Sequence, residues 1–238
     1  MERLDKVLSN LGYGSRKEIK QAIRKGLIEV NGEIVKDNGM QIDPENDRIV
    51  ANGEEIFYRK FIYLMMNKPD GVVSATTDTR DETVVDLLEI EHQVFNPFPV
   101  GRLDKDTVGL LLLTNDGDLN HRLISPKWKV DKVYYAKIDK KVTESDVNKF
   151  KKGITLDDGY LCKEAKLEIL SATDEGSEVM ITIQEGKYHQ VKRMFEAVDK
   201  NVVYLRRVEF GTLKLDEELE EGEYRELTEE EINILKGF

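Results

Sequence analysis

The sequence predicts an α+β protein with two domains, and three observations support this prediction. Residues 1–60 contain two short amphipathic helices and a hairpin signal. From residue 61 onward, strand-like apolar runs mix irregularly with helical segments, without the regular period of a parallel α/β fold. The apolar pattern thins between residues 41 and 60, so we expect domains at 1–60 and 61–238.

Composition narrows the class of protein further. The chain has 238 residues, of which 39% are hydrophobic, enough to bury a substantial core. The single cysteine, Cys162, excludes a disulfide framework and a multi-cysteine zinc site. The charged opening MERLDKVLSN does not fit a signal peptide, and no apolar run approaches the roughly 18 residues of a membrane span. We therefore expect a soluble cytoplasmic protein.

The first domain is predicted element by element from its spacing and turn signals. A first helix over residues 3–11 has one apolar stripe formed by Leu4, Val7, Leu8 and Leu11. Ser15 and Glu18 form a capping box that opens a second helix, which Gly26 ends. Residues 28–35 predict two short strands around Asn31-Gly32, the signal of a type I′ turn.

The second helix has a cationic face formed by Lys17, Lys20 and Arg24, opposite Ile19, Ala22 and Ile23. From the local pattern alone, a solvated surface is as good an explanation as a binding face. The segment RLDKVLSNLGYGSRKEIKQAIRKGLIEVNGEIV, however, resembles the S4 RNA-binding domain through all its elements. The resemblance implies that the helix and its adjoining loop dock RNA. The residues expected to do so are Arg16, Lys17, Lys20 and Arg24.

The second domain is predicted to contain seven strands and five helices. The expected strands are 61–66, 72–74, 109–113, 130–138, 165–170, 179–183 and 202–210. The expected helices are 83–88, 116–124, 145–151, 189–197 and a segment after Thr228.

Charge is distributed unevenly along the chain, whose net charge is -11. Residues 216–231 hold ten acidic side chains and one basic one, whereas residues 122–141 hold seven basic side chains against two acidic. Residues 187–207 hold six basic against two acidic. A polyanion responds to such local basic patches rather than to the total charge, so a nucleic-acid partner is consistent with the sequence. We expect the acidic segment to face outward, away from the RNA.

Several familiar catalytic signatures are missing. The sequence has no phosphate-binding G-x-x-x-x-G-K-[ST], no G-x-G-x-x-G and no H-E-x-x-H. Its three histidines are far apart and none has the spacing of metal ligands. These observations favour a reaction without a metal or other cofactor.

The segment GRLDKDTVGLLLLTNDGDL has a pattern suited to catalysis. A polar loop with Arg102, Asp104 and Asp106 leads directly into the apolar run 110–113, which predicts a buried strand. Carboxylates at the mouth of a buried strand are held rigidly and partly desolvated, as an acid, base or nucleophile requires. Taken alone, such an aspartate is more commonly a turn or capping residue.

Four segments together resemble the pseudouridine synthases: LMMNKPDGVVS, GRLDKDTVGLLLLTNDG, KVYYAKI and EGKYHQVKRMF. With the S4-like start, the resemblance covers nearly the whole chain. It implies a catalytic domain built on a mixed, largely antiparallel sheet with flanking helices. It also implies isomerisation of uridine to pseudouridine without a cofactor. The expected partner is ribosomal RNA or an RNA–protein assembly intermediate, of the small subunit or alternatively the large, and the expected protein is a monomer without membrane contact.

The resemblance implies three catalytic residues. Asp104 aligns with the family's catalytic aspartate, which acts on the ribose as nucleophile or base. Tyr134 aligns with the tyrosine that packs on the target base, although an ordinary strand aromatic is the alternative. Lys192 aligns with the cation that pairs with the aspartate and favours its ionised form, although a phosphate contact is the alternative.

Further residues are expected to contact RNA or to support the site. Arg102 resembles the arginine that fills the space left when the uridine leaves its stack. Arg193 is expected to contact phosphate, and His189 is equally compatible with RNA contact and with a structural hydrogen bond. Lys68 and its turn are expected to support the floor of the site, while Cys162 has no expected role.

Two rival functions compete with this hypothesis. A carboxylate hydrolase could use Asp104 and Asp106 as an acid–base pair, since two residues at this spacing on a strand lie about 7 Å apart. An S4-like domain has no place in a sugar hydrolase, however. A non-catalytic RNA-binding factor would be expected to lack Asp104, Tyr134 or Lys192, and all three are present.

Overall fold

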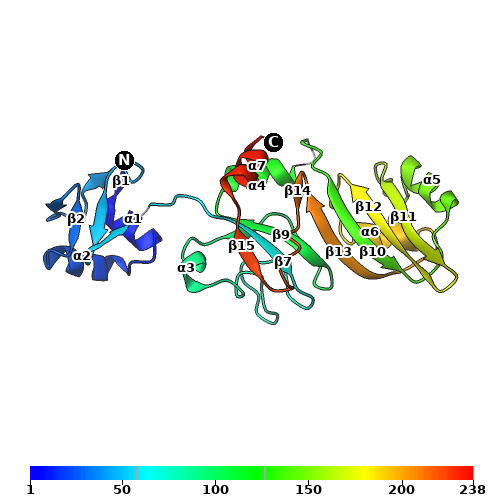
Figure 1. The fold of residues 1–238 in the computed structure, drawn as a ribbon, viewed down its shortest axis with the longest axis horizontal. Coiled ribbons are helices and arrows are strands. Elements are labelled where there is room, and N and C mark those ends of the chain that lie inside the picture. Colours follow the sequence, from blue (N-terminus) through cyan, green and yellow to red (C-terminus); the bar gives the residue numbers. More distant parts are fainter. Residues whose placement is uncertain (57, 126, 238) are drawn as a thin grey trace. The chain divides into compact units, whose positions relative to one another are not determined.

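The computed structural model describes residues 1–56, 58–125 and 127–237 (Figure 1). The chain forms two compact units, the first made of Met1–Ile62 and Leu88–Pro97 and the second of Tyr63–Leu87 and Phe98–Phe238. The division after Ile62 lies two residues beyond the boundary expected from the sequence. Residues 88–97, which the sequence pattern assigned to the second domain, cluster with the first unit.

The first unit packs two helices and a small antiparallel sheet around one core. The helices of this core are α1 (Leu4–Asn10) and α2 (Arg16–Arg24), and the unit also contains the short helix α3 (Ile90–Gln93). Its sheet has the order β3 (Glu33–Ile34), β2 (Ile28–Val30), β5 (Ile49–Ala51) and β6 (Glu54–Ile56). Leu4, Ile19 and Ile49 are among the buried residues that join helices and sheet in one cluster.

The predicted helix start and turn of this unit are confirmed. The Ser15 amide donates to the Glu18 carboxylate at 2.7 Å, and the Ser15 hydroxyl accepts from the Glu18 amide at 3.4 Å. Asn31 and Gly32 have φ angles of 55° and 84°, the left-handed pair that a type I′ turn requires. The pattern did not indicate β1 (Glu2–Arg3), β4 (Gln41–Ile42), β5, β6 or α3 (Ile90–Gln93), each of which is too short to carry a periodicity.

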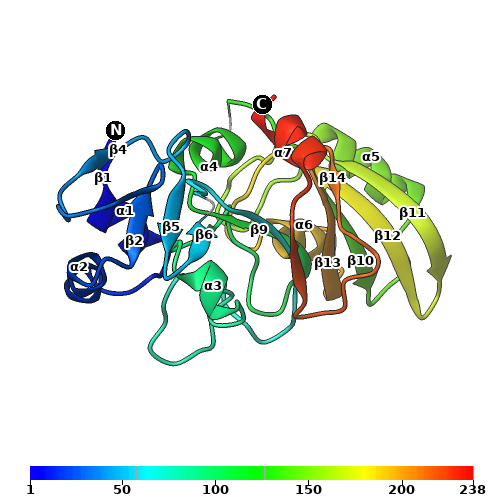
Figure 2. The same cartoon turned by 60° about the vertical axis from the view of Figure 1, so that its left-hand side comes forward.

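The second unit is built on a nine-stranded mixed sheet, so the predicted α+β class is confirmed (Figure 2). The main path of the sheet is β11 (Lys166–Thr173), β12 (Gly176–Ile183), β10 (Lys132–Ile138), β13 (Val202–Phe210), β9 (Val108–Thr114), β7 (Tyr63–Lys68) and β15 (Tyr224–Glu226). Two short strands pair beside this path, β14 (Leu213–Lys214) with β13 and β8 (Phe98–Pro99) with β9. β9 pairs with β13 in parallel, and the other described strand pairs of the sheet are antiparallel.

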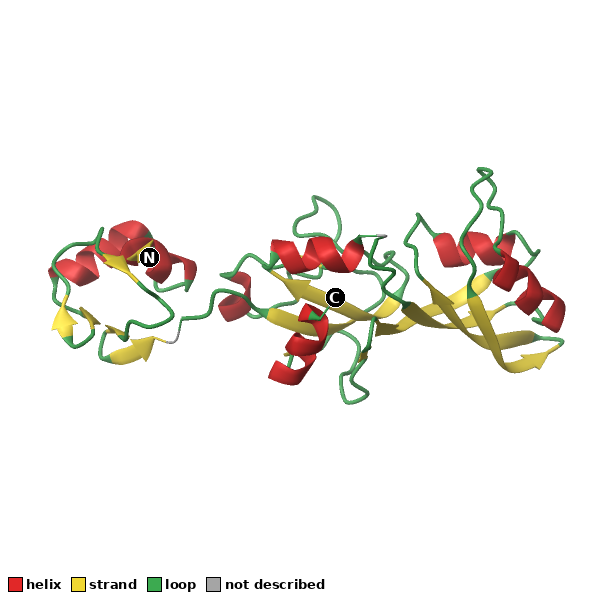
Figure 3. Ribbon diagram, turned by 90° about the horizontal axis from the view of Figure 1, so that it is seen from above, coloured by secondary structure: helices red, strands yellow, loops and turns green. Residues whose placement is uncertain are grey.

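Four helices lie along this sheet (Figure 3). They are α4 (Gly117–Ile124), α5 (Glu144–Lys152), α6 (Gln190–Glu196) and α7 (Glu229–Lys236). α5 packs on β11 and α6 on β13, while α4 packs against α7. These helices agree with four of the five that the sequence predicts for this domain.

The helix predicted over Thr83–Leu88 is wrong, because these residues form turns. The Asp86 carboxylate accepts from the amide and the hydroxyl of Thr83, both at 2.8 Å, which resembles a helix cap. The Val84 amide donates to the carbonyl of Val73 at 3.0 Å, the Asp86 amide donates to the Thr83 carbonyl at 3.1 Å, and residues 84–87 continue as turns in place of a helix. The strand predicted over 72–74 is likewise reduced to an isolated bridge between Val73 and Thr83.

A glycine is required where β9 meets β13. Gly109 lies opposite Arg207 in the parallel register and has a φ of +99°. A Cβ at this position would lie 2.3 Å from the Arg207 carbonyl oxygen, far inside van der Waals contact. The glycine thus lets the loop that precedes β9 join the centre of the sheet.

The acidic segment 216–231 is partly built into the sheet. It contributes β15, which pairs with β7 at the end of the strand order. Its one basic residue, Arg225, forms ion pairs with Asp216 at 2.6 Å and Glu231 at 2.8 Å. Among the described residues, no helix has the length and apolarity that crossing a membrane demands.

Candidate active site

The loop between β8 and β9 carries Asp104, and a neighbouring segment holds its backbone in place. The Ser74 hydroxyl donates to the Leu103 carbonyl at 2.9 Å and accepts from the Leu103 amide at 3.1 Å. The Gly71 amide donates to the Lys105 carbonyl at 3.0 Å, and the Thr107 amide closes a turn onto the Asp104 carbonyl. Both backbone neighbours of Asp104 are therefore fixed by hydrogen bonds from residues 71–74.

Lys68 provides a third support for this loop from inside the protein. Its side chain is fully buried, and Nζ donates to the carbonyls of Pro69, Lys105 and Thr107 at 2.9, 3.1 and 3.0 Å. All three ammonium protons therefore have acceptors. Burial lowers the pKa of Lys68 to about 8, partly countered by nearby carboxylates. This geometry agrees with the supporting role expected of Lys68.

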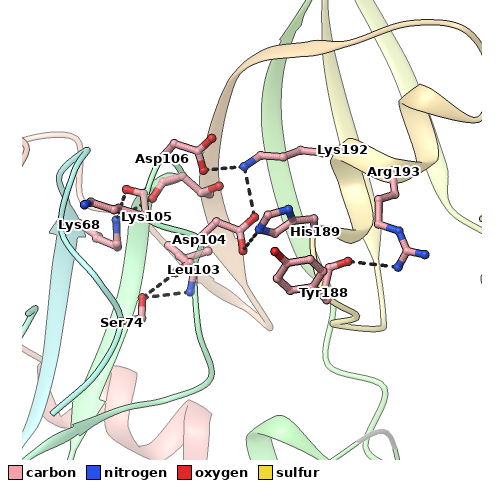
Figure 4. Close-up of polar contacts among 11 residues, drawn as sticks. Lys68, Ser74, Leu103, Asp104, Lys105, Asp106, Tyr188, His189, Lys192 and Arg193 are labelled. Carbon is pink, nitrogen blue, oxygen red and sulfur yellow. Dashed lines mark hydrogen bonds and ion pairs between the residues drawn. The ribbon is translucent and has the colours of Figure 1, made fainter. Parts of the chain in front are cut away.

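Asp104 faces a lysine and a histidine side chain from the segment around α6 (Figure 4). Lys192 Nζ lies 3.3 Å from one carboxylate oxygen, and His189 Nε2 lies 3.6 Å from the other. The Asp104 side chain is 28% exposed, so solvent still reaches it. Residues 85 and 88 positions away from Asp104 thus meet its carboxylate, which local sequence patterns cannot reveal.

Lys192 is shared between two carboxylates. Its ammonium lies closer to Asp106, at 2.5 Å, than to Asp104. Burial tends to lower the pKa of Lys192, but the hydrogen bond to Asp106 and both aspartate charges outweigh it, so the pKa is raised. Burial tends to raise the pKa of Asp106, yet Lys192 reverses the shift and lowers it. An ionised Asp106 at neutral pH is unsuited to be the general acid of the rival hydrolase.

Tyr134 lies on β10 in the middle of the sheet and is 7% exposed. It pairs across the strands with Arg207 of β13, whose guanidinium also interacts with the Tyr134 side chain. Tyr134 lines a small cavity of about 70 Å³ together with Asp104, Lys192 and Arg102. The three expected catalytic residues and Arg102, which is exposed, therefore meet at one cavity.

His189 and Arg193 occupy different surroundings. His189 precedes α6 in a left-handed conformation, with a φ of 48°, and its ring stacks on Tyr188 with centroids 3.8 Å apart. Arg193 pairs with Asp157 and, at 2.7 Å, with Asp158, and its side chain is 15% exposed. Figure 4 shows Arg193 directed away from Asp104. His189 thus joins the Asp104 cluster, whereas Arg193 is held apart from it by two carboxylates.

The expected RNA-docking residues of the first unit share one exposed helix. Arg16, Lys17, Lys20 and Arg24 lie on α2 and are all exposed. Ile19 and Ile23 of the same helix are buried in the core of the unit. Neutralising the cationic residues therefore leaves the buried face of α2 unchanged.

Sequence reasoning missed the contributions of Asp106 and Arg207. Asp106 belongs to the same loop as Asp104, but its contact with Lys192 depends on a tertiary approach. Arg207 is 2% exposed, although arginine at a strand position normally predicts a solvent-facing residue. Among the described residues, no three or more His, Cys, Asp or Glu side chains are grouped so as to hold a metal ion.

Comparison with known proteins identifies the class to which this fold and site belong. A family model described as RNA pseudouridylate synthase matches residues 62–197, and one described as S4 domain matches residues 2–49. The chain belongs to the RNA pseudouridylate synthase family and carries an S4 domain at its N-terminus. Both predicted resemblances are thereby confirmed, and the S4 domain indicates binding to RNA.

Individual relatives align over nearly the whole chain. An uncharacterized RNA pseudouridine synthase of Bacillus subtilis (strain 168) is 51% identical, covering 98% of each chain. The ribosomal small subunit pseudouridine synthase A of Vibrio cholerae serotype O1 is 41% identical, covering 97% of each. The ribosomal large subunit pseudouridine synthase B of Bacillus subtilis (strain 168) is 38% identical, covering 100% of this chain and 97% of its own. A solved pseudouridylate synthase structure is 40% identical with a TM-score of 0.69, covering 99% of this chain and 100% of its own.

Proposed function

We propose that this protein converts a uridine of ribosomal RNA into pseudouridine, and that this RNA belongs to the small subunit. Family membership supports the reaction, and the relatives named for ribosomal RNA support the substrate class. The 41% identity to a small-subunit enzyme supports that subunit. The 38% identity to a large-subunit enzyme makes large-subunit RNA the alternative.

The reaction is an isomerisation that is neutral in electrons and atoms. The bond between N1 of uracil and C1′ of the ribose breaks, the base turns, and a bond from C5 to C1′ forms. The C5 proton leaves and N1 takes up a proton, so the product has the composition of the substrate. An ionised carboxylate begins the reaction, either by adding to C1′ or by removing the 2′ proton. This is the role of Asp104.

One observation carries the assignment: the Asp104 carboxylate lies 3.3 Å from the Lys192 ammonium, beside a cavity that Tyr134 also lines. The ammonium places a positive charge beside the reacting carboxylate in both chemical routes. Hydrogen bonds to the backbone on either side of Asp104 hold the carboxylate where the ribose must arrive. Tyr134 packs on the uracil and is available to receive the C5 proton.

The target base must leave its stack to reach this carboxylate, because C1′ and C5 are not accessible within a helix. Arg102 lies at the exposed edge of the cavity and fills the space that the uridine leaves. His189 contacts the RNA beside Asp104. The α2 face with Arg16, Lys17, Lys20 and Arg24 docks a more distant part of the RNA through phosphates.

The test is to incubate the purified chain with unmodified small-subunit RNA, large-subunit RNA and the corresponding ribosome assembly intermediates. Pseudouridines are then mapped at nucleotide resolution. We expect one new pseudouridine in a small-subunit substrate. Modification of large-subunit RNA alone would replace the proposed subunit with the alternative, and release of free uracil in place of pseudouridine would favour the hydrolase.

A further inference from the structure

A second and larger cavity lies beside the candidate active site in the same unit. It has a volume of about 420 Å³, in the range of small-ligand sites. Arg102, Tyr134, Gly186 and Lys187 line both this cavity and the smaller one at Asp104. The two cavities are therefore neighbours that share these four lining residues. The chemistry assigned above to the smaller cavity does not account for the larger one.

The walls of the larger cavity are strongly cationic. Five of its lining side chains are basic, namely Arg102, Lys132, Lys163, Lys187 and Arg207, and one is acidic, Glu185. In the part of the chain that the structure describes, none of these five cations forms an ion pair with a carboxylate. Such an excess is contrary to the chain's net charge of -11.

The carboxylate of Glu185 offsets only one of the five positive charges of this wall. One of its oxygens accepts from the Tyr160 hydroxyl at 2.6 Å. The other accepts from the Lys163 amide at 2.9 Å and from Gln190 Nε2 at 3.1 Å. These three neutral donors occupy about three of its four acceptor sites.

Two of the cations lie next to each other, Arg207 buried and Lys132 partly buried. Arg207 is 2% exposed, donates through Nε to the Leu110 carbonyl at 2.7 Å, and has no hydrogen-bond partner at Nη2. Lys132 Nζ donates to the Val130 carbonyl at 3.0 Å. Both cationic groups lie near the Phe210 ring, at 4.9 and 5.5 Å from its centroid. Burial, together with the charge of Arg207, lowers the pKa of Lys132 to about 8.

Two neighbouring cations without an ion-pair partner among the described carboxylates are unfavourable, because both lose hydration and they repel each other. A negatively charged group in the cavity would relieve both costs. The aromatic side chains of Phe210 and Tyr160 offer apolar surface beside the charges. This combination suits a phosphate that is attached to a sugar and a base.

We propose that this cavity binds a backbone phosphate of the substrate RNA, next to the uridine held at Asp104, with Lys132 as its main cationic contact. The proposal rests on the proposed function, because the RNA chain entering the smaller cavity brings its adjacent phosphates to the larger one. Lys187, on the border of both cavities, contributes a second positive charge along the same path. The ligand class is thus a phosphodiester of single-stranded RNA.

The test compares salt dependence of RNA binding in the full-length protein and its variants. The probe is a fluorescent ten-nucleotide oligouridylate, whose affinity is measured between 50 and 200 mM NaCl. Lys132→Met removes the charge at nearly constant volume, and Lys132→Arg keeps it. Lys137→Met is the matched control, because Lys137 is an exposed residue of the same strand. Fluorescence of the single tryptophan, Trp128, checks that each variant is folded.

We expect Lys132→Met to flatten the slope of log affinity against log salt by about 0.7, the value for one lost contact with single-stranded RNA. Over this fourfold salt range, the wild type then loses about 2.6-fold more affinity than the variant. Lys132→Arg and Lys137→Met should keep the wild-type slope. A folded Lys132→Met variant with an unchanged slope would overturn the proposal.

Inorganic phosphate at matched ionic strength separates a free anion from the RNA backbone. Competition by phosphate that disappears in Lys132→Met supports the site, provided that the RNA slope also changes. Competition without any change in RNA slope would overturn the assignment to RNA. The affinity for RNA is measured in the absence of catalysis. A failure to form pseudouridine would therefore refute the proposed function without changing the result of the binding experiment, so the two failures can be distinguished.

Discussion

Replacement of Lys68 by methionine tests how the loop of Asp104 is held. Methionine has nearly the same length and apolar stem, but it removes the three hydrogen bonds to the carbonyls of Pro69, Lys105 and Thr107. Lys68 is fully buried, so water does not replace the lost donors. We therefore expect the substitution to destabilise the second unit and to loosen Asp104.

The magnitude follows from two opposing terms. Among the described residues, the carbonyls of Pro69 and Thr107 lose their donor, whereas the Lys105 carbonyl keeps the Gly71 amide. The two carbonyls without a donor cost about 1 to 3 kcal/mol each and the third lost bond about 1 kcal/mol, or roughly 5 kcal/mol together. Removing the buried ammonium offsets part of this loss, because the fall in the pKa of Lys68 from 10.5 to about 8 corresponds to about 3 kcal/mol at 1.36 kcal/mol per pKa unit. The net loss in free energy of unfolding is therefore about 2 kcal/mol.

The assay is urea unfolding followed by the fluorescence of Trp128, which reports on the second unit because the chain has no other tryptophan. Lys105→Met is the control. Lys105 belongs to the same loop, but its ammonium makes an exposed ion pair with Asp81 at 2.6 Å, so its loss should cost under about 1 kcal/mol. A Lys68→Met variant within about 0.5 kcal/mol of wild type would refute the reasoning.

The same comparison has a defined pH dependence. Because the folded-state pKa of Lys68 is lowered, the unfolded chain binds more protons between about pH 8 and 10.5. The Lys68 contribution to wild-type stability therefore rises with pH in that window. The gap between wild type and Lys68→Met should widen by about 2 kcal/mol between pH 7.5 and 10. A constant gap would contradict the lowered pKa.

Three further predictions concern other parts of the molecule. The triple variant Lys17→Gln, Lys20→Gln, Arg24→Gln should bind RNA more weakly and flatten the slope of log affinity against log salt by up to about 2. The rate of the chemical step at saturating RNA should stay that of the wild type. An unchanged slope would show that the α2 face is a solvated surface without a role in RNA binding. Gly109→Ala should cost more than about 3 kcal/mol in urea unfolding, because its Cβ would overlap the Arg207 carbonyl, and a loss below about 1 kcal/mol would show that β9 and β13 separate easily. Activity should survive exhaustive chelation on an RNA that needs no Mg²⁺ to fold, and its loss there would reveal a required metal.

Sequence reasoning was most successful where the determinants are local. The Ser15–Glu18 cap and the Asn31-Gly32 turn depend on neighbouring residues, and both are present in the structure. The helix expected at residue 83 was wrong, although its cap is present, because residues 84–87 form turns and the segment is bound to Val73 through the Val84 amide. A cap signal alone is therefore insufficient to predict the helix that would follow it.

The geometry of the candidate site was less accessible to sequence. The motif resemblance placed Asp104, Tyr134 and Lys192 in one site, but it did not indicate that Lys192 is shared with Asp106. In the sequence, Arg207 stands out only as one of the basic residues of 187–207. Its burial could not be predicted, because it depends on the order of the strands in the sheet. Side-chain partners that are far apart in the chain require the fold before they can be named.

Tritium release from RNA labelled at C5 of uridine, measured with Asp104→Asn, tests whether Asp104 is the reacting carboxylate. Asparagine keeps the size of the side chain and removes the carboxylate. We expect the variant to remain folded by Trp128 fluorescence, to keep its affinity for RNA, and to release no tritium above background while the wild type does. Substantial tritium release by the folded variant would contradict the assignment of Asp104 as the reacting carboxylate.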